Sequence, residues 1–250
     1  MKTANAGTRA MVLAAGLGTR LRPLTERVPK ALVEVGGRPL VGYALAQLAF
    51  AGIRDVIVNV HHLAEAVESS LGDGSSFGVR LRYSRESELL DSGGGIRRAR
   101  WFLEGGTFLV LNADTIQDVP LPDLLAAHRE SGAWATLVVR SDPRVERYGV
   151  VEVDEAGKVR RILGRPQAPG GGRRTMYAGV AVFEPEAFRY FPEGKSSLTR
   201  DVLPRMLSSG AEVGAYVYRG YWRTVDTAED LAAAREEVPR VGLSFLAGSS

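Results

Sequence analysis

The sequence predicts an α/β fold with a mostly parallel central sheet flanked by helices. Apolar, strand-like runs alternate with helix-like segments through the first ~115 residues, which is the order expected of βαβ units. The second half is richer in strand-like runs. The 250 residues are 45% hydrophobic, enough for a sizeable core, and no repeat or linker divides them. We therefore expect one domain over residues 1–250, with halves at about 10–115 and 116–238.

The elements of the first half follow from hydrophobic periodicity and from glycine stops. Ala10–Ala14 is a short apolar run that ends before glycines, so it predicts a buried strand. Residues 16–30 hold two glycines, two prolines and several basic residues, and they predict a long loop. The remaining elements are a helix at Pro39–Gly52, a strand at Asp55–Val60, a helix at Leu63–Leu71, a strand at Val79–Ser84, a helix at Gly94–Leu103 and a strand at Phe108–Leu111.

In the second half the same signals predict both strands and helices. The strands are Ala135–Arg140, Val150–Val153, Val159–Leu163, Tyr177–Phe183 and Val213–Tyr218. The helices are Pro185–Phe191, Leu198–Ser208 and Ala228–Val238. Residues 164–174, GRPQAPGGGRR, contain four glycines and two prolines, so we expect a flexible loop there.

The composition excludes several classes of protein. There is no cysteine, which removes disulfide scaffolds, thiolate catalysis and zinc sites that need thiolates. No apolar run approaches the ~20 residues of a membrane span, and residues 1–9 lack the apolar stretch of a signal peptide. We expect a cytoplasmic protein with no membrane partner. His61 and His62 are expected as a partly buried pair at a strand end, not as a zinc site.

The net charge of +3 comes from one segment of the chain. Between Arg9 and Arg38 there are six basic and two acidic residues, a local charge of +4. A nucleic-acid-binding protein would spread such charge along a face or stripe. We therefore expect no nucleic-acid partner, and a small polyanion is the better match.

The stretch from Leu13 to Arg38, LAAGLGTRLRPLTERVPKALVEVGGR, carries the chemistry. Glycines directly after a strand let backbone N–H groups approach a polyphosphate, and arginine and lysine supply charge for its oxygens. The dinucleotide fingerprint needs a third glycine where Leu21 stands, and no Walker loop is present. A hydride-transferring oxidoreductase is therefore disfavoured.

This stretch resembles the N-terminal signature of the sugar-1-phosphate nucleotidyltransferases, L-A-A-G-x-G-x-R-L-x-P-L-T-x-x-x-P-K-[PA]-L. It matches almost unbroken from Leu13 to Leu32, with Ala31 where proline is usual. The resemblance covers about residues 10 to 235 and rests on a long, ungapped motif. It continues at Gly37–Leu40, Val58–His62, Gly72–Gly78, Asp91–Ile96, Asn112–Asp114, Tyr148–Val150, Tyr177–Gly179 and Tyr221–Thr227.

The resemblance implies a Rossmann-like sheet of the nucleotide-diphospho-sugar transferase type, with an NTP-binding first half and a sugar-phosphate-binding second half. Such enzymes join an NTP to a sugar 1-phosphate and release pyrophosphate. By similarity, Arg20 and Lys30 are the catalytic residues. The residues implied in nucleotide binding are Leu13, Ala14, Ala15, Gly16, Gly18, Thr19, Glu86, Ser92, Gly93 and Asn112.

Two aspartates match the positions that hold the metal in this family. Asp114 follows a strand end, where open α/β sheets bind ligands, and Asp226 precedes the last helix. Mg²⁺ usually takes one or two carboxylates together with substrate phosphates. We therefore expect Mg²⁺ as the cofactor.

Base and sugar recognition are implied by the same resemblance. Glu86 falls where many relatives carry glutamine, and a carboxylate there can accept from uracil N3–H or from guanine N1–H and N2–H. A solvated charge at the strand end is the alternative for Glu86. Many relatives carry Glu-Lys-Pro where this chain has Gly164–Arg165–Pro166, so a glutamate that often holds a sugar hydroxyl is missing. The residues implied in sugar binding are Tyr148, Gly149, Arg165, Ala178 and Gly179.

Within the family, the pattern looks most like the bacterial N-acetylmuramate 1-phosphate uridylyltransferases of cell-wall recycling. GTP-dependent mannose or heptose 1-phosphate guanylyltransferases are the alternative, and an inactive nucleotide-sugar-binding regulatory protein is an alternative of another class. We expect small-molecule substrates and a monomer or small homo-oligomer. No hexapeptide repeat is present, so we expect no C-terminal β-helix.

Overall fold

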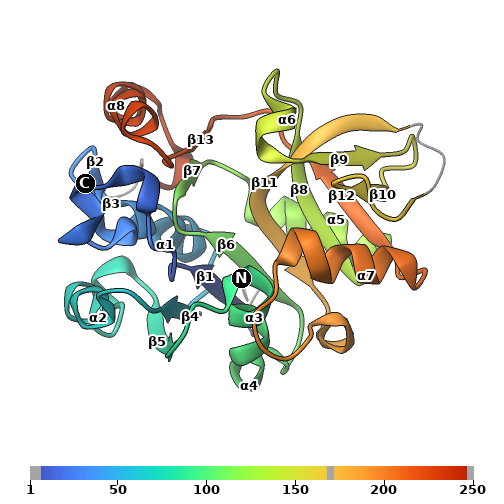
Figure 1. The fold of residues 1–250 in the computed structure, drawn as a ribbon, viewed down its shortest axis with the longest axis horizontal. Coiled ribbons are helices and arrows are strands. Elements are labelled where there is room, and N and C mark those ends of the chain that lie inside the picture. The colour runs from blue at the N-terminus through green and yellow to red at the C-terminus, as the bar shows by residue number, and fades with distance from the viewer. Residues whose placement is uncertain (1–6, 168–171, 247–250) are drawn as a thin grey trace. The chain divides into compact units, whose positions relative to one another are not determined.

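The computed structural model describes residues 7–167 and 172–246. The chain forms two compact units, each made of separate stretches of the sequence. Unit 1 comprises Met1–Leu89, Leu111–Leu121 and Gly220–Ser250, and unit 2 comprises Leu90–Val110 and Pro122–Arg219. The C-terminal helix, which we expected in the sugar-phosphate half, thus belongs to the same unit as the glycine-rich loop (Figure 1).

Unit 1 contains a parallel sheet with helices beside it. Strand β1 pairs in parallel with β4, and β4 pairs in parallel with β5. Three consecutive residues of β1 are buried, so both faces of this strand are covered, which explains its continuous apolar run, whereas β5 has both buried and exposed residues. Its strands and helices are β1 (Arg9–Leu13), β2 (Glu34–Val35), β3 (Arg38–Pro39), α1 (Leu40–Phe50), β4 (Asp55–Val60), α2 (Ala64–Leu71), β5 (Arg80–Arg85), β7 (Thr115–Gln117), β13 (Trp222–Thr224) and α8 (Ala228–Glu237).

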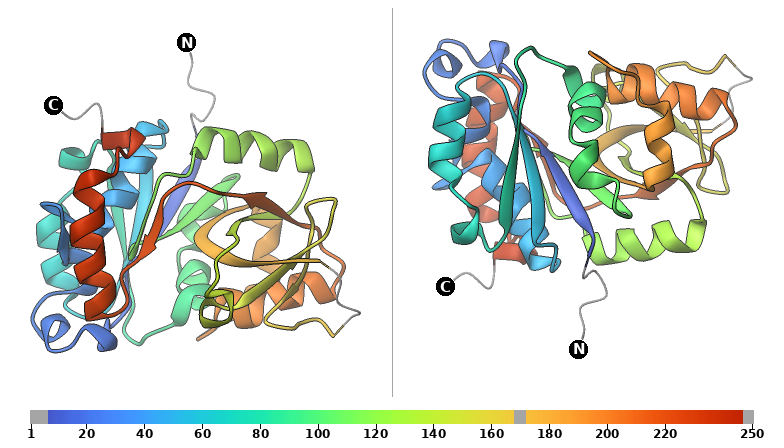
Figure 2. Two further views of the ribbon diagram at one scale, coloured as in Figure 1. Left: turned by 90° about the horizontal axis from the view of Figure 1, so that it is seen from above. Right: turned by 90° about the horizontal axis from the view of Figure 1, so that it is seen from below.

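A second core of unit 1 joins α1 to the C-terminal helix α8. Figure 2 shows α8, in red, next to the blue N-terminal segments of this unit. Leu40 and Tyr43 of α1 are buried with Leu231 and Ala234 of α8 in one apolar cluster. This burial fixes the start of α8, where Asp226 lies, against the N-terminal part of the chain.

Unit 2 is built mainly from antiparallel strands. Strand β11 pairs antiparallel with β8 and with β9, β9 pairs antiparallel with β10, and β12 pairs in parallel with β8. Helix α7 contacts β10 (Figure 1). The elements are α3 (Asp91–Arg98), α4 (Arg100–Leu103), α5 (Leu121–Ser131), β8 (Ala135–Arg140), α6 (Val145–Tyr148), β9 (Val150–Val153), β10 (Val159–Ile162), β11 (Arg173–Phe183), α7 (Leu203–Ser208) and β12 (Val213–Val217). Strand β6 (Phe108–Asn112) begins in unit 2 and ends in unit 1.

The α/β class predicted from the sequence is confirmed, and most predicted elements are present within one or two residues. The predicted helix at Gly94–Leu103 is wrong in its bounds, because α3 begins at Asp91 and the chain breaks at Ala99 before α4. The predicted loop over residues 16–30 contains short 3₁₀ turns at Thr19–Leu21 and Leu24–Glu26, and a third begins at Lys30.

Two further predictions differ from the structure. The segment 198–208, predicted as one helix, is a π-helical turn at Leu198–Val202 followed by α7. In the predicted loop 164–174, Arg173 and Arg174 begin strand β11 because they pair with β9. Residues 168–171 of that loop lie outside the described residues. No helix in the described ranges is long and apolar enough to cross a bilayer.

Candidate active site

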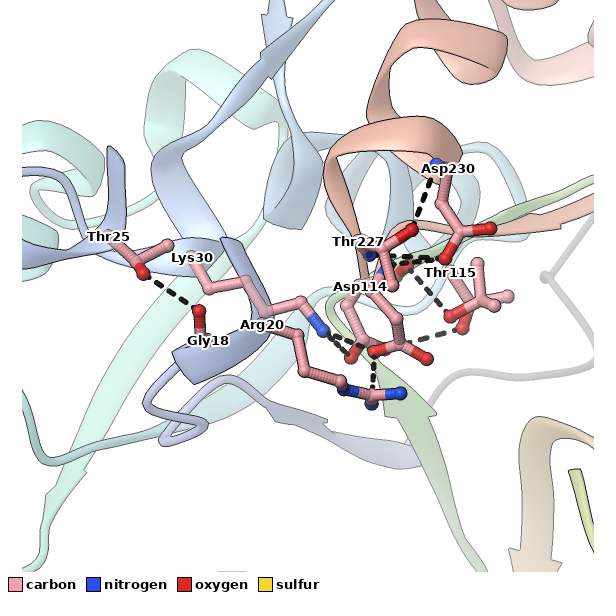
Figure 3. A network of polar contacts seen from close by, with 10 residues as sticks. Gly18, Arg20, Thr25, Lys30, Asp114, Thr115, Thr227 and Asp230 are labelled. Carbon is pink, nitrogen blue, oxygen red and sulfur yellow. Dashed lines mark hydrogen bonds and ion pairs between the residues drawn. The ribbon is translucent and has the colours of Figure 1, made fainter. Parts of the chain in front are cut away.

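The glycine-rich loop after β1 turns sharply at Gly18. This residue has φ +62°, and a Cβ added there would come within 2.8 Å of Thr25 Cγ2 and 3.0 Å of Lys30 Cβ. The hydroxyl of Thr25, a buried residue, donates to the Gly18 carbonyl oxygen at 2.7 Å (Figure 3). Glycine is therefore required at position 18 by both backbone conformation and space. Gly16 differs, since a Cβ added there would meet no atom within 4 Å.

Lys30 lies between two carboxylates. Its Nζ is 2.5 Å from Asp114 Oδ2 and 2.8 Å from Asp226 Oδ1, and its side chain is 11% exposed (Figure 3). Burial alone would lower the pKa of Lys30, but the charges of Asp114 and Asp226 outweigh it, and the pKa is raised. Lys30 is therefore a fixed positive charge near neutral pH.

Arg20 extends the same cluster toward solvent. One guanidinium nitrogen, Nη2, lies 3.0 Å from Asp226 Oδ1, and the Arg20 side chain is 61% exposed. Two cations thus converge on Asp226, one buried and one accessible. The positive charge predicted for this loop is placed at the end of the parallel sheet, beside two carboxylates.

Pairing of two short strands brings the aspartates together. Strand β7 follows Asp114, and strand β13 precedes Asp226; Thr115 pairs with Thr224 in antiparallel register. Val225 N donates to the Asp114 carbonyl oxygen at 2.9 Å. The two carboxylates, far apart in the sequence, therefore come from adjacent strand ends.

A capping box at the start of α8 holds the backbone of Asp226. Thr227 Oγ1 accepts from Asp230 N at 3.2 Å, and Asp230 Oδ2 accepts from Thr227 N at 3.1 Å and from Asp226 N at 3.3 Å. Asp226 is thus not the helix cap itself, because Thr227 has that role, and the Asp226 carboxylate is directed at the cations. The pattern Thr-x-x-Asp is a recognisable sequence signal for this cap.

Asn59, at the end of β4, connects the glycine-rich loop to Glu86. Its Oδ1 accepts from Ala14 N at 2.8 Å, and its Nδ2 donates to Glu86 Oε1 at 2.8 Å. Asn59 and Glu86 are 3% and 5% exposed, so the alternative of a solvated charge for Glu86 is wrong. Asn59 is not among the predicted site residues, although a polar residue in the apolar strand DVIVNV was the available signal.

The two adjacent histidines are partly buried, as expected. His61 Nδ1 lies 2.9 Å from the Glu86 carbonyl oxygen, and His62 Nε2 lies 3.3 Å from the Thr25 carbonyl oxygen. Both rings therefore contact backbone groups of unit 1.

Several predicted nucleotide residues of unit 1 are brought together. Leu13, at the end of β1, is linked to the end of β6 because Ala113 N donates to its carbonyl oxygen at 3.0 Å. Ala15 is buried, Thr19 opens the first 3₁₀ turn, and Asn112 ends β6. A small cavity of about 40 Å³ is lined by Leu13, Ala14, Gly16, Lys30, Ala31, Ala113 and Asp114.

Ser92 and Gly93 lie at the start of α3 in unit 2. Leu198 N donates to Ser92 Oγ at 2.8 Å, and Gly93 N donates to the Ser196 carbonyl oxygen at 2.7 Å. A Cβ added to Gly93 would come within 2.8 Å of Ser196 Oγ. Gly93 therefore has a packing role that the motif did not reveal, and its approach to the base stays a prediction.

The predicted sugar residues occupy two places in unit 2. Tyr148 ends α6, and Gly149 follows it with φ +92°. Met176 of β11 pairs with Val150 of β9, so the buried pair Ala178 and Gly179 lies a short way along β11 from Gly149. Arg165 is exposed and lines a larger hollow of unit 2 together with Arg200 and Arg205.

The donor set of unit 1 suits a magnesium ion. No cluster of three or more histidine, cysteine or acidic side chains that could hold a metal occurs within residues 7–167 and 172–246. Asp114 and Asp226 nonetheless converge on one buried cationic group, Lys30 Nζ. Two carboxylates that converge on one point match the preference of Mg²⁺ for few protein carboxylates, and the magnesium ion itself stays a prediction.

Comparison with known proteins places the chain in a family. Residues 9–240 match the family model described as "Nucleotidyl transferase". A UTP–glucose-1-phosphate uridylyltransferase from Synechocystis is 36% identical over 81% of this chain and 56% of its own length. A mannose-1-phosphate guanylyltransferase from Mycobacterium tuberculosis is 35% identical over 92% of this chain and 64% of its own length. The chain thus spans less than two thirds of the length of these relatives.

Solved structures show the same fold. A Bacillus anthracis structure in complex with a sucrose has a TM-score of 0.83 at 22% identity and covers 96% of this chain and 99% of its own. HddC from Yersinia pseudotuberculosis, complexed with GMP-PN, has a TM-score of 0.77 at 23% identity and covers 92% of this chain and 99% of its own. The family model matched over residues 9–240 shows that the chain belongs to the nucleotidyl transferase family.

Proposed function

We propose that this chain transfers a nucleotidyl group from an NTP to a sugar 1-phosphate and releases pyrophosphate. The observation that carries the proposal is the position of Lys30, buried between Asp114 and Asp226 and joined through Asp226 to the exposed Arg20. The family and the relatives named above support the same reaction class.

In this reaction an oxygen of the sugar phosphate forms a bond to the α-phosphorus of the NTP. The bond from the α-phosphorus to the bridging oxygen breaks, and that oxygen leaves with its electron pair as part of pyrophosphate. The attacking phosphate is already anionic near pH 7, so no general base is needed. The chain must instead position two anions and neutralise charge that develops on phosphate oxygens.

Lys30 and Arg20 supply that charge. Lys30 is held rigidly by two carboxylates, so it stabilises a phosphoryl oxygen without reorganising in the transition state. Arg20 is mostly exposed and presents a planar guanidinium that suits phosphate oxygens. Gly16 has no side chain and no atom within 4 Å of the position a Cβ would take, so backbone N–H groups of this loop can approach the triphosphate there.

Asp114 and Asp226 would hold Mg²⁺. The ion would neutralise phosphate oxygens of the NTP and of the incoming sugar phosphate. The chain's own contribution is the antiparallel pairing of β7 with β13 and the capping box of Thr227, which set the two carboxylates side by side.

For the base, the proposal assigns Glu86, Ser92, Gly93 and Asn112 to nucleotide binding. The buried Glu86 carboxylate is oriented by Asn59, and each carboxylate oxygen can accept more than one hydrogen bond. Uracil and guanine both present ring N–H groups to such an acceptor. We propose UTP as the nucleotide, with GTP as the alternative, and the two relatives are named for one of each.

For the sugar, we propose N-acetylmuramate 1-phosphate, bound by Tyr148, Gly149, Arg165, Ala178 and Gly179. A mannose or heptose 1-phosphate is the alternative. Gly164 stands before Arg165 where many relatives carry a glutamate that holds a sugar hydroxyl. The lack of this glutamate argues against a neutral hexose bound in the way that those relatives bind it.

A pyrophosphate-release assay with four NTPs against a panel of sugar 1-phosphates tests the proposal. We expect Mg²⁺-dependent release with UTP and N-acetylmuramate 1-phosphate, and no release when the sugar phosphate is omitted. Release with GTP and mannose 1-phosphate alone would favour the alternative substrates. If no pair reacts while NTPs still bind, the chain is a nucleotide-binding regulatory protein.

A further inference from the structure

Unit 2 contains a cavity of about 720 Å³ lined by three arginines. Its walls include Arg165, Arg200, Asp201, Pro204, Arg205 and Ser208. A second hollow of about 420 Å³ shares Arg165, Arg200 and Asp201 with it and adds Leu163 and Thr199. The two hollows therefore share one wall. We call the two hollows together the arginine cavity.

Three arginines and one aspartate, Asp201, line the arginine cavity. Among the described residues, no carboxylate forms an ion pair with Arg165 or Arg205. Arg200 is paired with Asp91, whose Oδ2 lies 2.8 Å from Arg200 Nη2, yet the Arg200 side chain is 67% exposed. Asp201, the acid in the lining, accepts a hydrogen bond from Ser197 N at 2.7 Å. Arg165 and Arg205 are thus available to an anionic ligand.

The arginine cavity adjoins residues assigned above to the sugar. Leu163 lines the smaller hollow, and its N–H donates to the Val150 carbonyl oxygen at 2.8 Å. A Cβ on Gly149 would come within 2.6 Å of Leu163 Cδ2, so these two residues are in close contact. Arg165 belongs to both hollows and to the assigned sugar residues. A sugar beside Gly149 would therefore lie next to the smaller hollow, which Arg165 and Arg200 also line.

We propose that the arginine cavity binds an acidic group on the sugar, separate from its 1-phosphate, and that the substrate class is an acidic sugar 1-phosphate. This inference rests on the proposed function. Guanidinium groups recognise carboxylates by two parallel hydrogen bonds, which suits a carboxylate-bearing substituent. A neutral sugar offers no carboxylate to Arg205, the arginine of the cavity that is not among the assigned sugar residues and has no acidic partner among the described residues.

Two matched pairs of substrates test the proposal. Glucuronic acid 1-phosphate differs from glucose 1-phosphate by a carboxylate, and N-acetylmuramate 1-phosphate differs from N-acetylglucosamine 1-phosphate by a carboxylate-bearing ether. We expect the wild-type kcat/KM for at least one acidic member to exceed that of its neutral partner by about tenfold or more, because hydrogen bonds to charged groups are strong. Equal values within both pairs would overturn the inference while leaving the proposed function intact.

Variants of Arg205 test whether the preference for the acidic substrate arises in the arginine cavity. Arg205→Gln should lower kcat/KM for the acidic substrate about 10–100-fold and change the neutral one by less than about twofold, since one charged hydrogen-bond donor is lost. Arg205→Lys should restore part of the loss because it keeps the charge. Arg129→Gln, an exposed arginine on α5 outside the cavity, is the matched control.

A binding measurement makes the inference independent of turnover. Calorimetric titration of both pairs of sugar 1-phosphates, each in the absence of NTP, should show tighter binding of the acidic member in at least one pair, and Arg205→Gln should remove the difference. If no pair of substrates gives pyrophosphate, the proposed function fails, and this titration still decides whether the cavity prefers an acid. Equal affinities within both pairs in the wild type would overturn the inference.

Discussion

Lys30 Nζ lies 2.8 Å from Asp226 Oδ1, although 196 positions separate the two residues in the sequence. The contact exists because β13 pairs with β7 and because Thr227 caps α8. A buried cation between two carboxylates is well compensated, but the loss of any member leaves an uncompensated charge. The catalytic assignment and the stability of unit 1 are therefore coupled at this point.

Lys30→Ala should lower the rate of pyrophosphate release by about 10²–10³ or more, because a charged donor to the transferring phosphoryl group is lost. NTP binding should be largely retained, since the loop backbone and Arg20 remain. Turnover and equilibrium NTP binding are the two measurements.

Lys158→Ala is the matched control for Lys30→Ala. Lys158 pairs with Glu212 and is 41% exposed, so its ion pair is screened by solvent. We expect turnover close to wild type for Lys158→Ala. Equally normal turnover for Lys30→Ala would remove Lys30 from catalysis.

Replacing the two aspartates by asparagine should abolish both activity and its dependence on Mg²⁺. An amide is a much poorer ligand for Mg²⁺ than a carboxylate of the same shape. The measurement is the initial rate of Asp114→Asn, Asp226→Asn and the double variant over a titration of MgCl₂, beside wild type treated with a chelator. A double variant that stays active and is still stimulated by Mg²⁺ would contradict the metal assignment.

The site was only partly predictable from the sequence. The motif from Gly16 to Lys30 is local and contiguous, so its residues could be recognised together. The pairing of Thr115 with Thr224 could not, because strands of three residues leave almost no periodic signal and their contact is long-range. The role of Asn59 was hidden within an apolar strand, and its partners Ala14 and Glu86 lie on other segments.

The fold was also predictable where local sequence signals are strong, and less so where tertiary contacts decide. Strands β4, β8 and β9 have the predicted bounds, because their apolar runs are bordered by clear breaks. Helix α3 begins earlier than predicted, at Asp91 with φ +61°, where Arg200 and the Ser196 backbone hold the turn. Tertiary contacts with a segment about a hundred residues away thus override the local glycine signal.

Glu86→Gln should change the ratio of kcat/KM values for UTP and GTP. Glutamine can keep the hydrogen bond from Asn59 through its carbonyl oxygen, so the local structure should persist. Its amide, however, offers donors where the carboxylate offers only acceptors, and guanine presents two N–H groups to that acceptor where uracil presents one. We expect the loss to be larger for GTP than for UTP. An unchanged ratio, measured with saturating sugar phosphate, would exclude Glu86 from base recognition.

The two loop glycines should respond differently to alanine. Gly18→Ala should lower the free energy of unfolding by about 1–3 kcal/mol, because φ +62° and the contact with Thr25 both oppose a Cβ. Gly16→Ala should leave the unfolding free energy within about 0.5 kcal/mol of wild type, since the position is open.

Kinetic measurements on the same two variants distinguish an effect on nucleotide binding from an effect on stability. If the backbone at Gly16 approaches the triphosphate, Gly16→Ala should raise the KM for NTP about tenfold or more without loss of stability, since a methyl group would stand between phosphate and backbone N–H. Denaturant unfolding and steady-state kinetics on both variants give the comparison. Normal kinetics for Gly16→Ala would mean that the nucleotide does not approach this residue.

The stability of the chain should decline as pH falls through the range in which histidine titrates. His128 is 1% exposed; its Nδ1 lies 2.8 Å from Thr136 Oγ1 and its Nε2 lies 3.0 Å from Glu184 Oε1. Burial lowers the pKa of His128 below 6.5, and the partly opposing effect of Glu184 does not restore it. The unfolded chain therefore binds more protons than the folded chain between the folded pKa and about pH 6.5.

It follows that the free energy of unfolding should be highest above about pH 7 and should fall below pH 6.5 by up to about 1.4 kcal/mol per pH unit from this single group. Urea denaturation between pH 5.5 and 7.5 measures the slope. Glu184→Gln removes the carboxylate that favours the protonated ring, so the pKa of His128 should fall further and the decline should extend to lower pH. His128→Gln should flatten the profile in this window, and a profile unchanged by both substitutions would show that another group governs it.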